Sequence, residues 1–146
     1  MNHLTYNETM RVCLCFLALV CALGAADKLP SETIRGKLIV HEGKPTVIET
    51  AEGRQIQVDG DAPTHKVLND ARVSGFDVQA RGHFTGPDRF QVDPQHTHAL
   101  LVRDHGSLKM ITYWCDVCSI RAYAPGPCVC CQKETTLELR DPDDIQ

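Results

Sequence analysis

Five cysteines lie close together near the C-terminal end of the chain, between positions 115 and 131. Four of them form two C-x-x-C pairs with nine residues between the pairs. Each short loop of this kind turns both of its sulfurs toward one point, so two such hooks can surround an ion about 2.3 Å from each sulfur. We therefore predict a metal site with zinc as the ion, while iron and copper stay open, and with the ligands Cys115, Cys118, Cys128 and Cys131.

The spacer between the two hooks is "SIRAYAPGP", in which Pro125 and Gly126 can turn the chain back on itself. A reversal there would present the second hook to the first. This stretch resembles the zinc-ribbon and rubredoxin-like knuckles, in which two hooks hold one metal ion. The resemblance covers residues 115–131 only, a segment that we call the cysteine knuckle, and it implies a structural metal site.

Two other uses of the cysteines stay open. The stretch "WCDVC" looks like the Trp-Cys-x-x-Cys of thioredoxin-like oxidoreductases, with Cys115 as nucleophile and Cys118 as resolving thiol. That chemistry needs a thiol pKa lowered by a helix N-terminus, and no βαβ pattern surrounds the stretch. Alternatively, disulfides staple a binding module together, although five thiols leave one unpaired and a bridge between the neighbours Cys130 and Cys131 would be strained.

The N-terminal segment has the features of a secretory signal peptide. An apolar stretch from Val12 to Leu23 is followed by the small residues Gly24, Ala25 and Ala26, and it is too short to span a bilayer comfortably. We predict that residues 1–26 are removed and that the mature chain is exported to a periplasm or the extracellular space, with no transmembrane helix. Oxidising compartments favour disulfides over free thiolates, and a bound metal would protect the sulfurs there.

The charge pattern excludes some functions. The 146 residues carry a net charge of −4, and the basic residues stand singly among acids. Nucleic-acid binders need a basic surface for phosphate contacts, so we predict no nucleic-acid partner and place the phenylalanines Phe76, Phe84 and Phe90 in the core. No nucleophile elbow, phosphate loop or glycosidase acid pair is present, so we predict no enzyme. The partner is an unknown protein or small ligand.

Alternating apolar and polar residues predict a mainly β protein of one domain. Three strands, a short helix over residues 64–71 and further strands follow one another, which is the element order of an OB fold. We therefore predict a small OB-like barrel with one short helix and a C-terminal cysteine knuckle. The barrel is assigned to residues 27–114, the metal-binding knuckle to 115–131, and a strand and acidic tail to 132–146. The predicted strands are 33–41, 46–50, 54–58, 76–84, 89–93, 98–104 and 108–114.

Two further polar motifs have a metal-binding alternative. His96 and His98 would lie on one face of a strand, a spacing that can bind a transition metal, but no third ligand is near in the sequence, so we predict a polar loop entering a strand. Asp59 and Asp61 in "VDGDAPT" lack the further acids of a calcium loop. We predict that they form a turn that caps the helix.

Overall fold

The computed structural model describes residues 30–144. The predicted signal peptide lies outside these residues, so its cleavage and the export of the chain stay predictions. Within residues 30–144, no helix is both long enough and apolar enough to cross a membrane.

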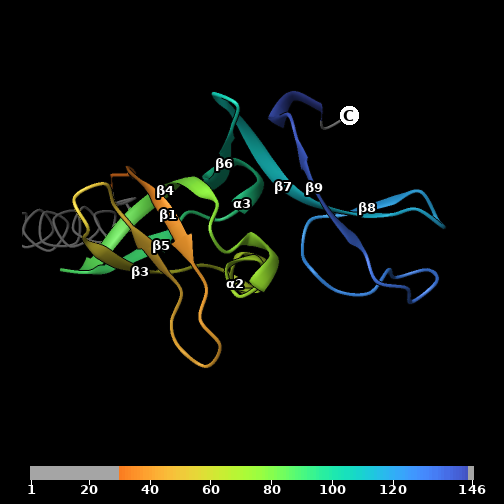
Figure 1. Cartoon of the computed structure of the whole chain (residues 1–146), viewed down its shortest axis with the longest axis horizontal. Coiled ribbons are helices and arrows are strands. Elements are labelled where there is room, and N and C mark those ends of the chain that lie inside the picture. Colours follow the sequence, from red (N-terminus) through yellow and green to blue (C-terminus); the bar gives the residue numbers. More distant parts are fainter. Residues whose placement is uncertain (1–29, 145–146) are drawn as a thin grey trace, which may run out of the picture.

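The described chain consists of short strands with brief helical segments between them (Figure 1). The predicted strands and helix are all found, with ends shifted by a few residues. The elements are β1 (Glu32–Ile39), β2 (Val47–Glu49), β3 (Gln55–Asp59), α2 (Ala62–Leu68), η1 (Ala71–Val73), β4 (Asp77–Gly86), β5 (Arg89–Val92), α3 (His96–Ala99), β6 (Leu100–Asp104), β7 (Ser107–Cys115), β8 (Ile120–Ala122), β9 (Thr136–Arg140) and η2 (Pro142–Asp144).

Five strands close into a barrel. β1 pairs with β2 and β2 with β3, all antiparallel, and β3 then runs parallel to β5. β5 pairs with β4, and β4 returns to β1, which completes the circle. Helix α2 lies between β3 and the segment η1 that leads into β4. The predicted fold class, a mainly β protein with a small OB-like barrel, one short helix and a C-terminal cysteine cluster, is confirmed.

The barrel core is formed by one face of each strand together with α2. Val67 and Leu68 of α2 are buried in it, and Asp61 caps the helix by accepting a hydrogen bond from the Thr64 backbone N–H at 3.0 Å. The rings of Phe84 and Phe90 meet edge to face, 5.0 Å apart. Two earlier predictions are therefore confirmed: the acidic turn caps the helix, and the phenylalanines pack in or against the core.

Glycine at position 82 is required where β4 changes partners. Gly82 pairs with Glu32 of β1 on one side and with Val92 of β5 on the other. A Cβ atom at Gly82 would lie 2.0 Å from the backbone oxygen of Gln91, a contact that no side-chain rotation can relieve. A side chain here would force the two strands apart, so the missing side chain allows the tight coiling that closes the barrel.

β7 carries the chain from the barrel into the cysteine knuckle. Its first half pairs with β6 and its last residues with β8, whereas β9 pairs along its other edge. Ile111 and Tyr113 of β7 belong to the barrel core, and Cys115 ends the strand. In Figure 1 the strands β7, β8 and β9 extend to one side of the barrel. β7 thus runs across the predicted boundary between residues 114 and 115.

Two arginines hold the knuckle strands in place. Arg72 of η1 pairs with Asp70 at 2.8 Å, lies 5.1 Å from the centre of the Tyr113 ring, and donates to the Thr135 backbone oxygen at 2.8 Å. Its guanidinium therefore joins the barrel to the chain just before β9. The second is Arg121 of β8. It stacks on the Trp114 ring of β7 and forms an ion pair with Glu138 of β9.

The segment with the two histidines leads into a strand, as predicted, but it is a short helix rather than a loop, and the metal-binding alternative is wrong. Residues 96–99 form the short helix α3 and β6 begins only at Leu100, so His96 and His98 do not share a strand face. Gln95 adopts a left-handed conformation, and its carbonyl accepts hydrogen bonds from the backbone N–H groups of His98 and Ala99. This turn buries His96 and leaves His98 exposed, so the segment is more than a polar loop.

We predict that Gly82→Ala lowers the free energy of unfolding by about 3 kcal/mol, because the added methyl group meets backbone rather than a flexible side chain. Gly86→Ala, in the same strand, is the matched control: its nearest neighbour would be 3.8 Å away, an ordinary contact. This variant should stay within about 0.5 kcal/mol of the parent protein. Urea denaturation measures both, and equal losses would contradict this account of barrel closure.

Candidate metal centre

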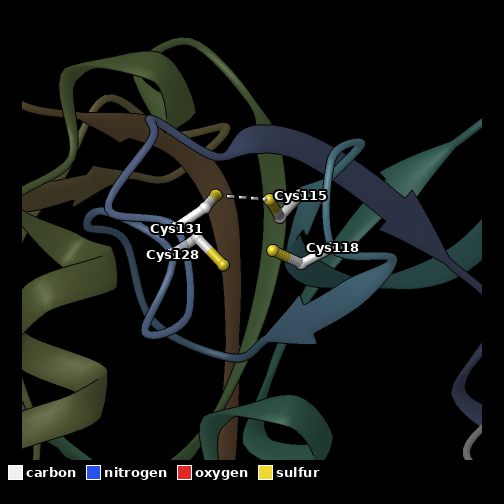
Figure 2. A group of neighbouring side chains, drawn as sticks. All are labelled: Cys115, Cys118, Cys128 and Cys131. Carbon is white, nitrogen blue, oxygen red and sulfur yellow. Dashed lines mark hydrogen bonds between the residues drawn. The ribbon is translucent and has the colours of Figure 1, made fainter.

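Four cysteine sulfurs converge at the end of the β7–β8–β9 sheet (Figure 2). Cys115 ends β7 and Cys118 lies in the turn into β8, whereas Cys128 and Cys131 lie in the loop between β8 and β9. All four sulfur atoms are within 4.8 Å of one another. The sulfurs of Cys115 and Cys131 are 3.5 Å apart. Sulfurs arranged tetrahedrally at about 2.3 Å from an ion are about 3.8 Å from one another, so the cluster has the size of a four-sulfur metal site.

The four clustered cysteines are those that the sequence predicts as ligands, and the fifth lies apart. Cys130 is exposed and is not a member of the group. All five cysteines of the described chain are free thiols, so the disulfide-stapled alternative has no bridge in this structure. The structure therefore separates the fifth thiol from the four in the way that the C-x-x-C spacing suggests.

In the first hook, the backbone turns around the sulfur of Cys115. The backbone N–H groups of Cys118 and Val117 both point to this sulfur and favour its ionised form. The N–H of Ser119 donates to the Cys115 carbonyl at 2.8 Å and closes the turn. Ser119 has a φ of 52°, in the left-handed region, which directs the chain from the hook into β8.

The second hook repeats this backbone arrangement. The N–H groups of Cys131 and Cys130 point to the sulfur of Cys128, and the N–H of Gln132 donates to the Cys128 carbonyl at 2.9 Å. Gln132 is also left-handed, with a φ of 59°. Two loops with different sequences therefore present their sulfurs in the same way, as metal-binding knuckles do.

The loop that carries the second hook is tied off at its base. Pro127 and Glu134 form an isolated antiparallel bridge, and the Cys128 backbone N–H donates to the Lys133 carbonyl at 2.8 Å. The buried hydroxyl of Thr135 donates to the Gly126 carbonyl at 2.9 Å, at the predicted Pro-Gly reversal. These bonds fix the loop before any ion binds.

The four thiols influence one another's ionisation. Hydrogen bonds from the Cys131 and Cys130 backbone N–H groups lower the pKa of Cys128 to about 7. For Cys115, the Cys118 N–H also lowers the pKa, but burial and the neighbouring thiols outweigh it and the net shift is upward. The Cys130 and Cys131 thiols raise the pKa of Cys118. The Cys128 thiolate thus forms readily, whereas Cys115 and Cys118 would ionise only if a cation in the cluster offset the added negative charge.

This geometry does not favour the redox alternative. A nucleophilic thiol needs a low pKa and access, and Cys115 has a raised pKa and is buried. The segment after Cys118 is strand β8, so no helix N-terminus points at the pair. Four sulfurs around one point also leave no open position for a substrate, which is typical of structural rather than catalytic metal sites.

No protein-family model matches the chain, and neither the curated proteins nor the solved structures contain a significant match.

Ser119 and Gln132 belong to the hooks, although their residue types do not predict it. Glycine is the usual sequence signal for a left-handed position, and neither of these two positions is a glycine. The one available signal is positional, because each residue directly follows the second cysteine of a C-x-x-C pair.

We predict that Ser119→Gly keeps or raises the stability of the protein by up to about 1 kcal/mol, because glycine adopts the left-handed conformation without a steric cost. Ser119→Val should lower it by about 1–2 kcal/mol, since a β-branched residue is strongly disfavoured there. Thermal or urea denaturation of the two variants tests this, and the same pair at Gln132 tests whether the hooks are equivalent. A valine variant as stable as the glycine variant would contradict it.

Proposed function

We propose that the protein is an exported, OB-like small barrel that binds one structural zinc ion through Cys115, Cys118, Cys128 and Cys131 and has a binding or scaffolding role. The observation that carries the metal site is the pair of backbone-equivalent hooks whose four sulfurs lie within 4.8 Å of one another. The zinc-ribbon resemblance of the knuckle and the closed site support a structural rather than a catalytic ion.

Zinc is favoured over other ions by the ligand set. Four thiolates in a tetrahedral arrangement suit zinc or iron, and zinc has no redox chemistry of its own. In the oxidising compartment that the leader sequence implies, an ion without redox chemistry would keep the sulfurs from pairing into disulfides. If metal analysis finds iron instead of zinc, the proposed ion is wrong, but the proposed four-cysteine site stands.

The binding role rests on where apolar side chains are exposed. Four large hydrophobic residues of the described chain are exposed, and all four belong to the cysteine knuckle: Val117 (60%), Ile120 (37%), Tyr123 (40%) and Val129 (82%). Val117 and Val129 lie inside the two hooks. A metal that fixes the hooks would hold these side chains out toward solvent, and a protein partner with an apolar surface would cover them.

We predict that protein purified without chelator contains about one zinc ion per chain, measured by elemental analysis. Cobalt(II) bound in place of zinc should give the absorption bands of a tetrahedral four-thiolate site. Cys115→Ser and Cys128→Ser should each abolish these bands and most of the metal binding.

Cys130→Ser is the matched control and should keep the metal content of the parent, because Cys130 lies outside the group of four. Cys118→Ser is tested together with Cys130→Ser. The Cys130 thiol lies close enough to Cys118 to raise the Cys118 pKa, so we expect it to replace Cys118 as a ligand in the single variant. Absence of metal together with two mapped disulfides would instead establish the disulfide-stapled module. A metal-free dithiol at Cys115 and Cys118 that a disulfide substrate oxidises would favour the redox alternative.

We predict a steep pH dependence of metal binding. In the metal-free protein the raised pKa values of Cys115 and Cys118 keep both thiols protonated near pH 7, and the ion binds only thiolates. At least two protons must therefore leave, so the apparent affinity should fall about a hundredfold or more for each pH unit below 7. Competition with a chelator of known affinity measures this; a slope of one proton or fewer would mean that the thiols are already ionised.

A further inference from the structure

A cavity of about 390 Å³ opens where the barrel meets the chain after β8. Its walls come from the start of α2, from α3 with the preceding Gln95, and from Tyr123 of the cysteine knuckle. The volume is in the range of small-molecule sites, about 300–1,000 Å³. Most of the lining is apolar, with Pro63 and the Tyr123 ring among it, and no lysine or arginine contributes. The cavity is separate from the four cysteines.

A buried imidazole in the wall of this cavity lacks a partner. His96 is 3% exposed, and its Nε2 forms no hydrogen bond with any described residue. A buried polar atom without a partner costs about 1–3 kcal/mol, so such atoms are rare in native proteins. Gln95, which precedes it, is held in the left-handed region with φ 65° and directs the ring inward at a further conformational cost. Both costs are explained if a ligand supplies the missing partner.

Two of the polar groups that line the cavity, His96 and Asp61, call for a hydrogen-bond donor. Burial lowers the pKa of His96, so the ring is neutral, and its bond to the Tyr123 backbone carbonyl places the proton on Nδ1. Nε2 is then an acceptor. Asp61 also lines the cavity, and hydrogen bonds from the Thr64 hydroxyl and backbone N–H keep its pKa low and its carboxylate charged.

We propose that this cavity binds a small planar molecule that carries a cationic N–H group, such as an amidinium or an aminopyridinium. The cation faces Asp61, an N–H of the ligand donates to Nε2 of His96, and the ring packs between Pro63 and Tyr123. A carboxylate ligand of the same shape is excluded because Asp61 repels it and the cavity has no lysine or arginine to bind it.

The test uses benzamidine as the probe and benzoate, which has nearly the same shape and the opposite charge, as its control. In an NMR titration of the full protein, benzamidine should shift the amides of residues 95–99 and the His96 ring signals to saturation, and benzoate should not. The zinc content of each sample is measured alongside, so that loss of metal is not mistaken for loss of the cavity. Equal shifts with both probes, or no saturable shift with benzamidine, would overturn the proposal.

Three variants locate the contacts. Asp61→Asn keeps the helix cap, because asparagine caps as well as aspartate, and should weaken benzamidine binding about tenfold. His96→Leu should weaken it at least tenfold, because the variant lacks the Nε2 acceptor; it also loses the ring's bond to the Tyr123 carbonyl, so its thermal stability is measured alongside to show that it is folded. Glu42→Gln removes the same charge in an exposed turn and should change nothing. Unweakened binding in Asp61→Asn or in His96→Leu would show that these residues have structural roles only.

Discussion

Repulsion among crowded sulfurs is the constraint on which the C-terminal half of this protein depends. Four thiols within 4.8 Å of one another cannot all lose their protons unless a positive charge lies between them. The backbone nevertheless points N–H groups at Cys115 and Cys128 in the manner that stabilises thiolates. Donors that stabilise negative charge, in a cluster that cannot hold that charge alone, support the proposed metal ion, which would neutralise it. Without an ion, the same donors ionise Cys128 first, while Cys115 and Cys118 stay protonated.

β7 makes this cluster part of the barrel rather than an appendage. Side chains two residues apart lie on the same face of a strand, so the face that buries Ile111 and Tyr113 in the core also directs Cys115 toward the other sulfurs. Arg72 adds a second connection, because it contacts the Tyr113 ring and the backbone before β9 at once. Movement in the knuckle is therefore transmitted to core residues through a continuous strand, and metal binding is expected to stabilise the barrel as well.

Much of this architecture could be predicted from local patterns. Alternation gave the strands, Pro63 and Asp61 marked the helix start, and C-x-x-C spacing identified the four clustered cysteines, because these signals act over a few residues. Pairing between distant segments has no such signal. The parallel contact of β3 with β5 and the position of β9 beside β7 follow from closing the barrel and burying its core. His96 was misjudged for the same reason, since its burial depends on the left-handed turn at Gln95 and on the distant Tyr123.

The position of Cys130 within its hook explains why a fifth thiol is present outside the group of four. Cys130 is the third residue of the second hook, as Val117 is of the first, and at both positions the backbone N–H points to the leading cysteine sulfur. The hook therefore uses the backbone of this residue and directs its side chain outward, where Cys130 and Val117 are both exposed. A valine serves as well as a cysteine there. The extra thiol thus leaves the four-sulfur geometry intact, and any role it has must come from its exposed sulfur beside Cys118.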